Sequence, residues 1–474
     1  MVRRLHQALT QGAFALAAAA VVATAGVWVA VALPSHPALA QSAAGVVAYE
    51  GARLIPGDGR PAIERGVLLV EGGRIRQVGA AGSVGVPSGA ARVDLGGKTV
   101  IPALVNAHTH PGFQRGASYA RENYTREQVI QDLERAHYFG VAAVLSQGID
   151  PGDIASQIRV DQAAGRVGGA RLLHAGRGIG SPNAGPGAAA YQGIAYELTT
   201  PDAGRAAVAE LAAQKVDMVK IWVDDRNGRA PRLSEPAFRA IIDEAHRRGL
   251  RANAHVFYLE DLKQLVEAGV DGLAHLARDL ELDDAAVAAI VKRGVAVMPT
   301  LATPERTTHT SVPPSLSAWL DSPDAMALGA PVAERVKAAF GSRTAEAASA
   351  ARQRYVILQR SVARLAKAGA KLLLGSDTGI QDHPFGFTDH RELEMLVEAG
   401  ATPMQALVAA TSRSAEYLRL GDLGTLAPGK AASFVVLDAN PLDDITNTRR
   451  IADVYIDGRR VDRPAFRARM AAAR

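Results

Sequence analysis

Strand-like and helix-like segments alternate eight times through the middle of this 474-residue chain, and this alternation constrains the fold more than any other feature. The eight strand-like apolar runs are residues 100–108, 141–148, 171–176, 217–223, 250–256, 270–276, 295–301 and 371–377. Amphipathic helix patterns lie between most of them, for example at 235–249, 259–269 and 284–294, and each of these three ends in glycine. The repeats predict an α/β fold, a (β/α)8 TIM barrel over residues 102–423.

An open doubly wound sheet is the alternative, but no glycine-rich phosphate loop follows the first strand. One interval departs from the strand–helix alternation. Residues 302–355, between the seventh and eighth strands, are too long for a simple crossover. We expect this insertion either to cover the C-terminal face of the barrel as a lid or to decorate its outside.

Short strands broken by glycine turns precede and follow the barrel region. They fall within residues 45–101 and again within residues 424–465, where the Asp457-Gly458 pair suits a tight hairpin. Two β-rich ends around a different middle predict a small composite β-sandwich domain formed by both ends of the chain.

Residues 1–40 have the pattern of a signal peptide. Arg3 and Arg4 precede the apolar run at 13–33, and small residues at 38–40 suit a cleavage site. We therefore expect an exported protein, periplasmic or secreted. Because the apolar run approaches bilayer-spanning length, an uncleaved membrane anchor is the alternative.

The chain contains no cysteine, so disulfides and cysteine-based zinc sites are excluded. Any metal must bind to His, Asp, Glu, Lys or backbone oxygen. The formal net charge is +5, without a basic cluster interleaved with aromatic residues, so no nucleic-acid partner is expected. Nothing in the sequence decides between a monomer and a homo-oligomer.

Six metal-competent residues fall at the ends of five of the predicted strands, where barrel enzymes assemble their sites. They are His108, His110, Lys220, His255, His275 and Asp377. His108 and His110 stand two positions apart on a strand and therefore point to the same side. Taken singly, each histidine could be a buried structural residue and Asp377 a helix N-cap. His174 also ends a predicted strand, and we interpret it as structural.

Lys220 lies among apolar neighbours, where an unpaired ammonium is costly. Burial lowers the pKa of a lysine and favours the neutral amine. A neutral amine can take up CO2 to form a carbamate, whose two oxygens can bridge two cations. The alternative is an ion pair with Asp217, Asp224 or Asp225.

With these residues the sequence resembles the amidohydrolase superfamily, in particular the branch of imidazolonepropionase-like proteins and carboxylated-lysine prolidases and amidases. The resemblance covers essentially the whole chain after residue 40. Its motifs are 108-HTH-110, 219-VKIW-222, 253-NAHV-256, 273-LAHL-276, 374-LGSDTG-379 and 422-DLGTLAPGKAASFVVLD-438.

The resemblance implies two divalent metal ions, zinc by default, and a carboxylated Lys220 that bridges them. His108, His110 and Asp377 would bind the more buried ion, while His255 and His275 would bind the second. A metal-bridging hydroxide would attack the substrate carbonyl, and Asp377 would accept its proton and pass it to the leaving nitrogen.

Relatives often carry a Gly-Gly-His-Gly loop after the third strand, whose histidine helps to hold substrate. The corresponding stretch here, residues 177–187, has no histidine, which puts a specific dipeptidase activity in doubt. Tyr258 could donate a hydrogen bond to the substrate carbonyl or oxyanion, or could be a packed tyrosine. Weaker candidates are His309, His383 and Arg391.

The predicted function is hydrolysis of an amide or peptide bond in a small molecule, a dipeptide or an N-acyl amino acid. Lys220 favours this reading, because deaminases and imidazolonepropionases of the superfamily generally use one metal and do not need the lysine. Two alternatives stay open: a mononuclear cyclic amide or imine hydrolase or deaminase, and a non-catalytic binding protein on the same scaffold.

Overall fold

Eight parallel strands occupy the middle of the chain in the computed structural model, which describes residues 45–472. They are β6 (Leu104–Thr109), β9 (Val141–Ser146), β10 (Arg171–His174), β13 (Met218–Val223), β14 (Arg251–Val256), β15 (Gly272–Ala274), β16 (Ala296–Met298) and β17 (Lys371–Leu372). Each predicted strand-like run contains one of them, in the predicted order. The strands are nearly all buried because their sequences are almost continuously apolar.

The parallel strands pair in two sheets. One has the order β10-β9-β6, and the other continues from β13 through β14, β15 and β16 to β17, with the short strands β11 (Ile179–Gly180) and β12 (Tyr196–Glu197) at its edge. Backbone contacts join the sheets at both ends: a parallel bridge links Thr109 to Thr378, and the Asp217 amide donates to the His174 carbonyl at 2.9 Å. The fold is therefore a TIM-barrel-like α/β fold, and closure into a complete barrel stays a prediction.

A helix follows each of these strands. The helices are α1 (Arg126–Tyr138), α2 (Ile154–Ala163), α3 (Pro201–Ala213), α4 (Glu235–Arg247), α5 (Leu259–Glu267), α6 (Asp284–Arg293), α10 (Ala345–Lys367) and α11 (Phe387–Glu398). The predicted glycine ends are confirmed, because Gly249, Gly269 and Gly294 take positive φ angles of 72°, 87° and 66° just after α4, α5 and α6. At the other end of α6, the Asp283 side chain accepts a hydrogen bond from the Ala286 amide at 2.8 Å.

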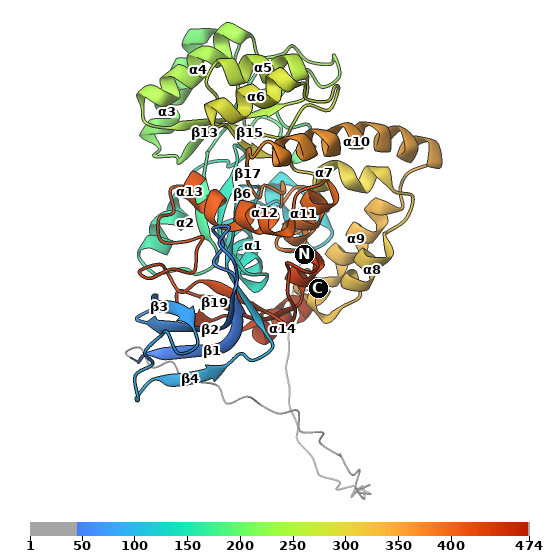
Figure 1. Cartoon of the computed structure of the whole chain (residues 1–474). Helices are drawn as coiled ribbons and strands as arrows, with labels where there is room; N and C mark the ends of the chain where they lie inside the picture. The colour runs from blue at the N-terminus through green and yellow to red at the C-terminus, as the bar shows by residue number, and fades with distance from the viewer. Residues whose placement is uncertain (1–44, 473–474) are drawn as a thin grey trace, which may run out of the picture. The chain divides into compact units, whose positions relative to one another are not determined.

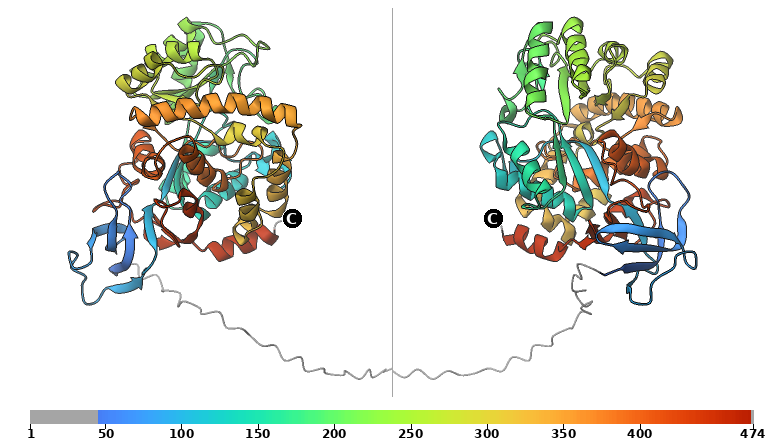
Figure 2. Two further views of the ribbon diagram at one scale, coloured as in Figure 1. Left: turned by 45° about the vertical axis from the view of Figure 1, so that its right-hand side comes forward. Right: turned by 90° about the vertical axis from the view of Figure 1, so that its left-hand side faces the viewer.

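Strands from both ends of the chain share one mixed sheet, seen as blue and red strands side by side (Figures 1 and 2). Its members are β1 (Val47–Leu54), β2 (Ile63–Glu71), β3 (Arg74–Ala80), β4 (Ala91–Asp94), β5 (Thr99–Pro102), β18 (Phe434–Leu437), β19 (Ile451–Ile456) and β20 (Arg459–Arg460). β18 runs antiparallel to β5, and the Phe434 ring packs between Tyr49 and Tyr455 at centroid distances of 5.1 and 4.7 Å. All eight strands belong to one sheet, in which β4 pairs with β1 off the main strand order, so the sandwich and its domain boundaries stay predictions.

One predicted strand needs correction. Residues 100–108 were expected to form a single strand, but β5 ends at Pro102 in the mixed sheet and β6 begins at Leu104 in the parallel sheet. Ala103 joins the two, and its amide donates to the Ser433 carbonyl at 3.0 Å. The proline explains the break, because it has no amide hydrogen to continue a central ladder.

The insertion at residues 302–355 is mostly helical. It contains α7 (Ala302–Glu305), α8 (Pro314–Leu320), α9 (Ala330–Phe340) and the first half of α10. Its centre packs on α11, because the Trp319 ring stacks on Phe387 with centroids 4.1 Å apart. The part around Trp319 is therefore packed decoration, whereas Thr303 and Arg306 at the start of the insertion reach the cavity described below.

Remaining elements are short or terminal. They are β7 (Gln114–Arg115), β8 (Ser118–Tyr119), α12 (Pro403–Val408), a π-helical turn (Ala409–Arg413), α13 (Ser414–Tyr417) and α14 (Arg463–Ala472). The predicted signal peptide at residues 1–40 lies outside the described residues. Between residues 45 and 472, no helix is both long and apolar enough to cross a bilayer.

His390 in α11 gives a testable pH dependence. Burial lowers its pKa from 6.5 to about 4, and its Nε2 bonds to the Phe139 carbonyl at 2.9 Å. A pKa that is depressed in the folded state adds stability above pH 6.5, which is lost as the pH falls toward 4. In His390→Gln, whose amide can still donate to Phe139, we expect the loss of unfolding free energy between pH 7 and pH 4 to shrink by roughly 3 kcal/mol. Urea unfolding at both pH values measures it, and an unchanged loss would contradict the assignment.

Candidate metal centre

His108 and His110 point to one side of β6, as their spacing predicts. Their ring centroids lie 5.1 Å apart, and both Nε2 atoms approach Asp377 Oδ1, at 3.2 Å from His108 and 2.9 Å from His110. The backbone of β6 also touches the segment after β17, because the Asp377 amide donates to the His108 carbonyl at 3.0 Å. The first and last predicted ligand positions therefore form a single cluster.

Asp377 and His275 both adopt left-handed backbone conformations, with φ angles of 58° and 89°. Such values are uncommon for residues other than glycine and cost of order 1–3 kcal/mol each, so the surrounding structure must enforce them. They follow β17 and β15, where each strand leaves its sheet. Strained residues of this kind often mark functional sites, and here they aim both side chains at the His108 ring.

Three of the predicted ligands meet around one point. The ligand atoms of His108, His275 and Asp377 all lie within 4.8 Å of one another, as in a metal-binding cluster. The ring of His255 lies beside His275, with centroids 4.7 Å apart. His110 joins the cluster through its contact with Asp377. All five side chains are buried, and they come from both sheets.

Lys220 is 1% exposed and has no acidic partner within 4.0 Å among the described residues. Its Nζ donates to Gln147 Oε1 at 3.1 Å, and burial lowers its pKa to about 7. The predicted alternative of an ion pair is wrong, because Asp224 bonds to His255 and Arg226 instead. One detail of the prediction also needs correction: Lys220 is the third of six residues in β13 and not the last.

Gly148 makes room for Lys220. It has a φ of 87°, and a Cβ added there would lie 2.8 Å from Lys220 Cβ. We expect Gly148→Ala to lower the free energy of unfolding by more than the roughly 1–3 kcal/mol of backbone strain alone. Gly152→Ala is the control, because Gly152 has a φ of 68° and open space around it. Equal losses in the two variants, measured by urea unfolding, would show that Lys220 is not confined by this contact.

Hydrogen bonds fix the two histidines on the neighbouring strands. His255 Nε2 bonds to Asp224 Oδ2 at 2.9 Å, and His275 Nδ1 bonds to the Thr300 hydroxyl. Each ring therefore keeps its other nitrogen available for the cluster. Carboxylate and hydroxyl partners of this kind orient metal-binding imidazoles.

The protonation states also suit a divalent cation. Burial, reinforced by nearby Lys220, lowers the pKa of His108 well below its usual value, and burial lowers that of His255 to about 4. These imidazoles are neutral near pH 7, which is the form that binds metal. The buried Nδ1 atoms of His108 and His110 have no hydrogen-bond partner among the described residues. The residues present thus fit a divalent metal ion at the cluster of His108, His275 and Asp377.

A cavity of about 400 Å³ opens onto the cluster. All six predicted ligands line it, together with Pro186 and Gly187 from the 177–187 loop, Tyr119 and Tyr191, and Thr303 at the start of the insertion. The Thr303 hydroxyl donates to Asp377 Oδ2 at 3.2 Å. The site can therefore hold a small molecule against the His/Asp cluster.

Tyr258 lies outside the residues that line this cavity. Its hydroxyl donates to Asp225 Oδ1 at 2.8 Å, and the Arg232 guanidinium lies 4.1 Å from its ring centre. The structure therefore does not place Tyr258 beside the predicted ligands, and Phe257 lines the cavity instead. These contacts favour the alternative of a packed tyrosine, and a catalytic role for Tyr258 stays a prediction.

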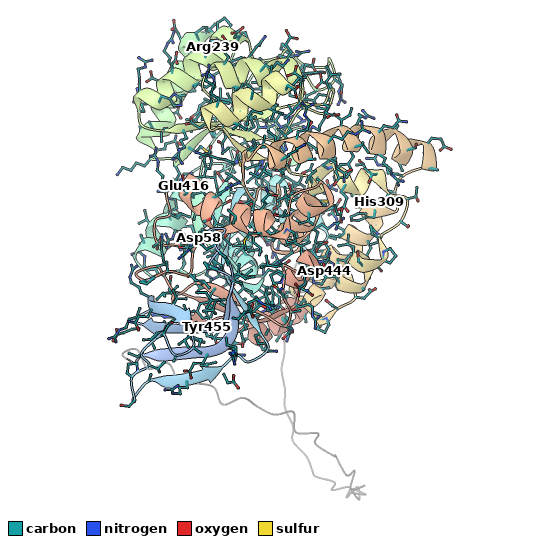
Figure 3. All side chains as sticks on the ribbon, viewed as in Figure 1. Asp58, Arg239, His309, Glu416, Asp444 and Tyr455 are labelled. Atoms are coloured by element: carbon teal, nitrogen blue, oxygen red, sulfur yellow. The ribbon has the colours of Figure 1, made fainter. Side chains whose placement is uncertain are left out.

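The three weaker candidates, His309, His383 and Arg391, make structural contacts. His309 lies in the insertion with its ring 5.9 Å from that of Phe340 (Figure 3). His383 bonds to the Gln381 carbonyl at 2.9 Å, and Arg391 pairs with Glu305, Glu394 and Glu398. His174 is buried and bonds to the Ser156 hydroxyl at 3.2 Å, in line with its structural interpretation.

Sequence reasoning missed three residues of the site. Gln147 holds Lys220 and also donates to the Ala107 carbonyl at 2.6 Å, and Arg278 and Arg306 line the cavity walls. Arg278 stands three residues after His275, and its charge beside the end of a buried strand was an available signal. Arg306 could not be assigned because it belongs to the insertion.

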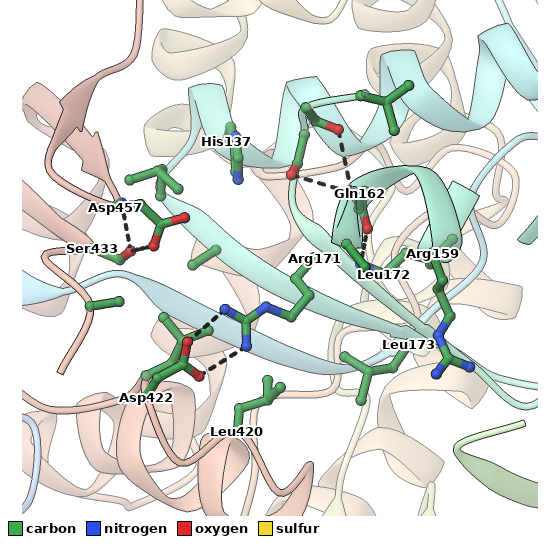
Figure 4. A pocket seen from close by; sticks show the side chains of 18 of the residues that line it. His137, Arg159, Gln162, Arg171, Leu172, Leu173, Leu420, Asp422, Ser433 and Asp457 are labelled. Carbon is green, nitrogen blue, oxygen red and sulfur yellow. Dashed lines mark hydrogen bonds and ion pairs between the residues drawn. The ribbon is translucent and has the colours of Figure 1, made fainter. Parts of the chain in front are cut away.

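A larger cavity, about 1820 Å³, lies at the opposite ends of the strands, where Arg171 begins β10 and Met218 begins β13 (Figure 4). None of the six predicted ligands lines it. Two of the polar groups in its wall are partnered: Arg171 donates to both carboxylate oxygens of Asp422 at 2.9 and 2.7 Å, and Gln162 donates to the Ala170 carbonyl at 2.9 Å. Size alone does not make it the reactive site.

Known proteins resemble this chain in sequence and in fold. The model of the amidohydrolase family matches residues 99–461. An imidazolonepropionase of Cereibacter sphaeroides is 26% identical over 417 residues, which cover 81% of this chain and 90% of that protein. The solved structure of phenylurea hydrolase B is similar with a TM-score of 0.69 and 25% identity, covering 89% of this chain and 98% of that one.

An uncharacterised protein of Mycobacterium tuberculosis is 30% identical over 209 residues, or 43% of this chain, and the chain spans about half of that protein's length, 51%. Because the family model covers most of the sequence, the chain belongs to the amidohydrolase family. The prediction that the chain belongs to the amidohydrolase superfamily is therefore confirmed.

Proposed function

We propose that the protein hydrolyses an open-chain amide or peptide bond in a small molecule at a centre of two divalent ions, with zinc as the default metal. The observation that carries the proposal is the convergence of His108, His110, His275 and Asp377 beside a buried lysine that has no acidic partner between residues 45 and 472. The proposal includes closure of the eight parallel strands into one barrel, which the bridge between Thr109 and Thr378 supports.

Residues of this chain would hold the ions in two groups. His108, His110 and Asp377 form the more buried group, His255 and His275 the second, and a carboxylated Lys220 would lie between them. When bound, divalent ions would supply a Lewis acid that polarises the scissile carbonyl and lowers the pKa of an attacking water. A role in holding the ions would account for a buried Lys220 that bonds to Gln147 and has no carboxylate within 4.0 Å among the described residues.

Asp377 is the proposed proton carrier. Its Oδ1 faces His108 and His110, and its Oδ2 accepts a hydrogen bond from Thr303. Burial alone would raise its pKa, but the surrounding histidines outweigh burial and hold the pKa well below its usual value. The carboxylate would accept a proton from the attacking water as the carbon–oxygen bond forms. It would then deliver that proton to the nitrogen as the carbon–nitrogen bond breaks.

Dipeptides and N-acyl amino acids are the proposed substrate class. The cavity volume of about 400 Å³ suits molecules of this size. A solved neighbour that is a phenylurea hydrolase by name supports an open-chain carbon–nitrogen substrate. The 177–187 loop lines the cavity with Pro186 and Gly187 and without a histidine, so the substrate must be recognised by other groups.

A second candidate function is hydrolysis or deamination of a cyclic amide or imine at a single metal ion. The imidazolonepropionase relative favours it, as does the compact three-residue cluster of His108, His275 and Asp377. The metal-loaded protein should be assayed against Xaa-Pro and Xaa-Arg dipeptides, N-acyl aromatic amino acids and cyclic imides. Turnover of open-chain amides supports the first function, and turnover of cyclic imides alone supports the second. No turnover would leave a non-catalytic binding protein.

We further propose that the protein acts outside the cytoplasm, on the basis of the sequence pattern at residues 1–40. Cell fractionation with a C-terminal tag tests this. Recovery in the periplasm or medium with loss of the first 40 residues is the expected result, and recovery only in the cytoplasm at full length would contradict it.

A further inference from the structure

Two partly buried arginines on the wall of the metal-site cavity, Arg278 and Arg306, have no acidic partner among the described residues. Arg229 on the same wall also lacks a carboxylate within 4.0 Å there, but it is exposed and donates to the Arg226 carbonyl at 2.9 Å. Among the described residues, neither Arg278 nor Arg306 has a carboxylate within 4.0 Å, whereas Arg226 on the same wall lies 3.5 Å from Asp224. Arg278 Nε is buried without a hydrogen-bond partner, and the guanidinium lies 5.1 Å from the Phe257 ring centre. Arg306 donates only to neutral groups, the Gln381 carbonyl and the His383 ring.

The two guanidiniums come from separate parts of the fold. Arg278 follows β15 by four residues, and Arg306 begins the 3-10 turn after α7. Both line the same cavity as His275 and Asp377. A substrate held at the metal cluster therefore lies beside two partly buried guanidiniums that have no carboxylate within 4.0 Å among the described residues.

The remaining acidic groups of this cavity are already engaged. Asp224 bonds to His255 and to Arg226, and Asp377 faces His108 and His110. Desolvation of a guanidinium without a counter-charge costs several kcal/mol, and burial accordingly lowers the pKa of both Arg278 and Arg306. Arginine binds carboxylates with paired, charge-assisted hydrogen bonds. Anionic groups of a ligand would complete these two sites.

We propose that the cavity takes an amide substrate with two carboxylates, an N-acyl or aminoacyl derivative of aspartate or glutamate, and that Arg278 and Arg306 bind the carboxylates. This inference rests on the proposed function only in assuming that the bound amide is hydrolysed. The binding of a dicarboxylate can be tested without turnover.

The direct test is calorimetric binding of glutarate and butyrate to the metal-loaded protein. Glutarate can bind both guanidiniums at once, whereas butyrate can bind only one of them, so the difference between the two acids isolates the second carboxylate. We expect glutarate to bind more tightly by about 10- to 100-fold, as one charge-assisted pair predicts. Equal affinities for the two acids in the wild-type protein would overturn the proposal.

Single-residue variants test whether Arg278 and Arg306 produce the preference for glutarate. Arg278→Met and Arg306→Met should each remove most of the glutarate preference and leave butyrate binding unchanged. Arg232→Met is the matched control, because Arg232 pairs with Asp225 and Asp261 outside the cavity lining. Where Arg278→Met does not fold, Arg278→Lys replaces it and should retain part of the preference. Full retention in both arginine variants would overturn the assignment.

Kinetics separate this inference from the proposed reaction. N-acetylglutamate should have a higher kcat/KM than N-acetylglutamine, and Arg278→Met should abolish the difference through KM while kcat changes little. If no amide is hydrolysed but glutarate binding behaves as expected, the proposed function fails and the dicarboxylate site stands. If amides are hydrolysed without preference for the acidic substrate, the dicarboxylate site fails and the hydrolase stands.

Discussion

Asp377→Asn is expected to lower kcat for amide hydrolysis by about 1,000-fold, within the range of a general acid–base group. The amide keeps the shape of the carboxylate and its contact with Thr303, but it cannot accept the proton of the attacking water. Steady-state kinetics on the metal-loaded variant measure the effect, with KM expected to change less than kcat.

Asp225→Asn is the matched control for Asp377→Asn. Asp225 bonds to Tyr258 and Arg232 and does not line the cavity, so its variant should keep kcat within about twofold. A similar loss in both variants would indicate a general effect on the fold. A fully active Asp377→Asn protein would remove Asp377 from the reaction.

Lys220 gives the second large effect, because its proposed role needs CO2. Protein that is loaded with metal in CO2-free buffer should have activity lower by about tenfold or more, since the bridge between the ions is missing. Added bicarbonate should restore the activity over time. Lys220→Met should be inactive under both conditions.

The control for the bicarbonate effect is Lys263→Met, which changes an exposed lysine paired with Asp283. This variant should respond to bicarbonate like the wild type. Full activity of the wild-type protein without CO2 would contradict a carboxylated lysine and would favour the mononuclear alternative.

Much of the fold could be predicted because it depends on local periodicity. Each predicted apolar run corresponds to one of the parallel strands. The glycines that end α4, α5 and α6 adopt the positive φ expected there. The split between β5 and β6 was missed because the apolar pattern runs without interruption across Pro102 and Ala103. Only long-range pairing, of β5 with β18 and of β6 with β9, separates these strands.

The ligand cluster could be predicted because the carboxyl ends of parallel strands lie at the same edge of the sheet, even when the strands are far apart in the chain. His108 and His110 met Asp377 for this reason, although nearly 270 residues separate them in the chain. Contacts that depend on side-chain direction could not be predicted. Asp224 was one of three possible ion-pair partners of Lys220 but bonds to His255, and Gln147 was not recognised as the partner of Lys220. Tyr258 points to Asp225 while its neighbour Phe257 lines the cavity.

Metal content per chain, measured together with activity for the wild type and Lys220→Met, tests the central claim most directly. We expect about two divalent ions per wild-type chain, as in a two-ion hydrolytic centre. The folded variant should lose at least one ion together with amide hydrolysis. A single ion per chain in both proteins, with equal activity, would contradict the account.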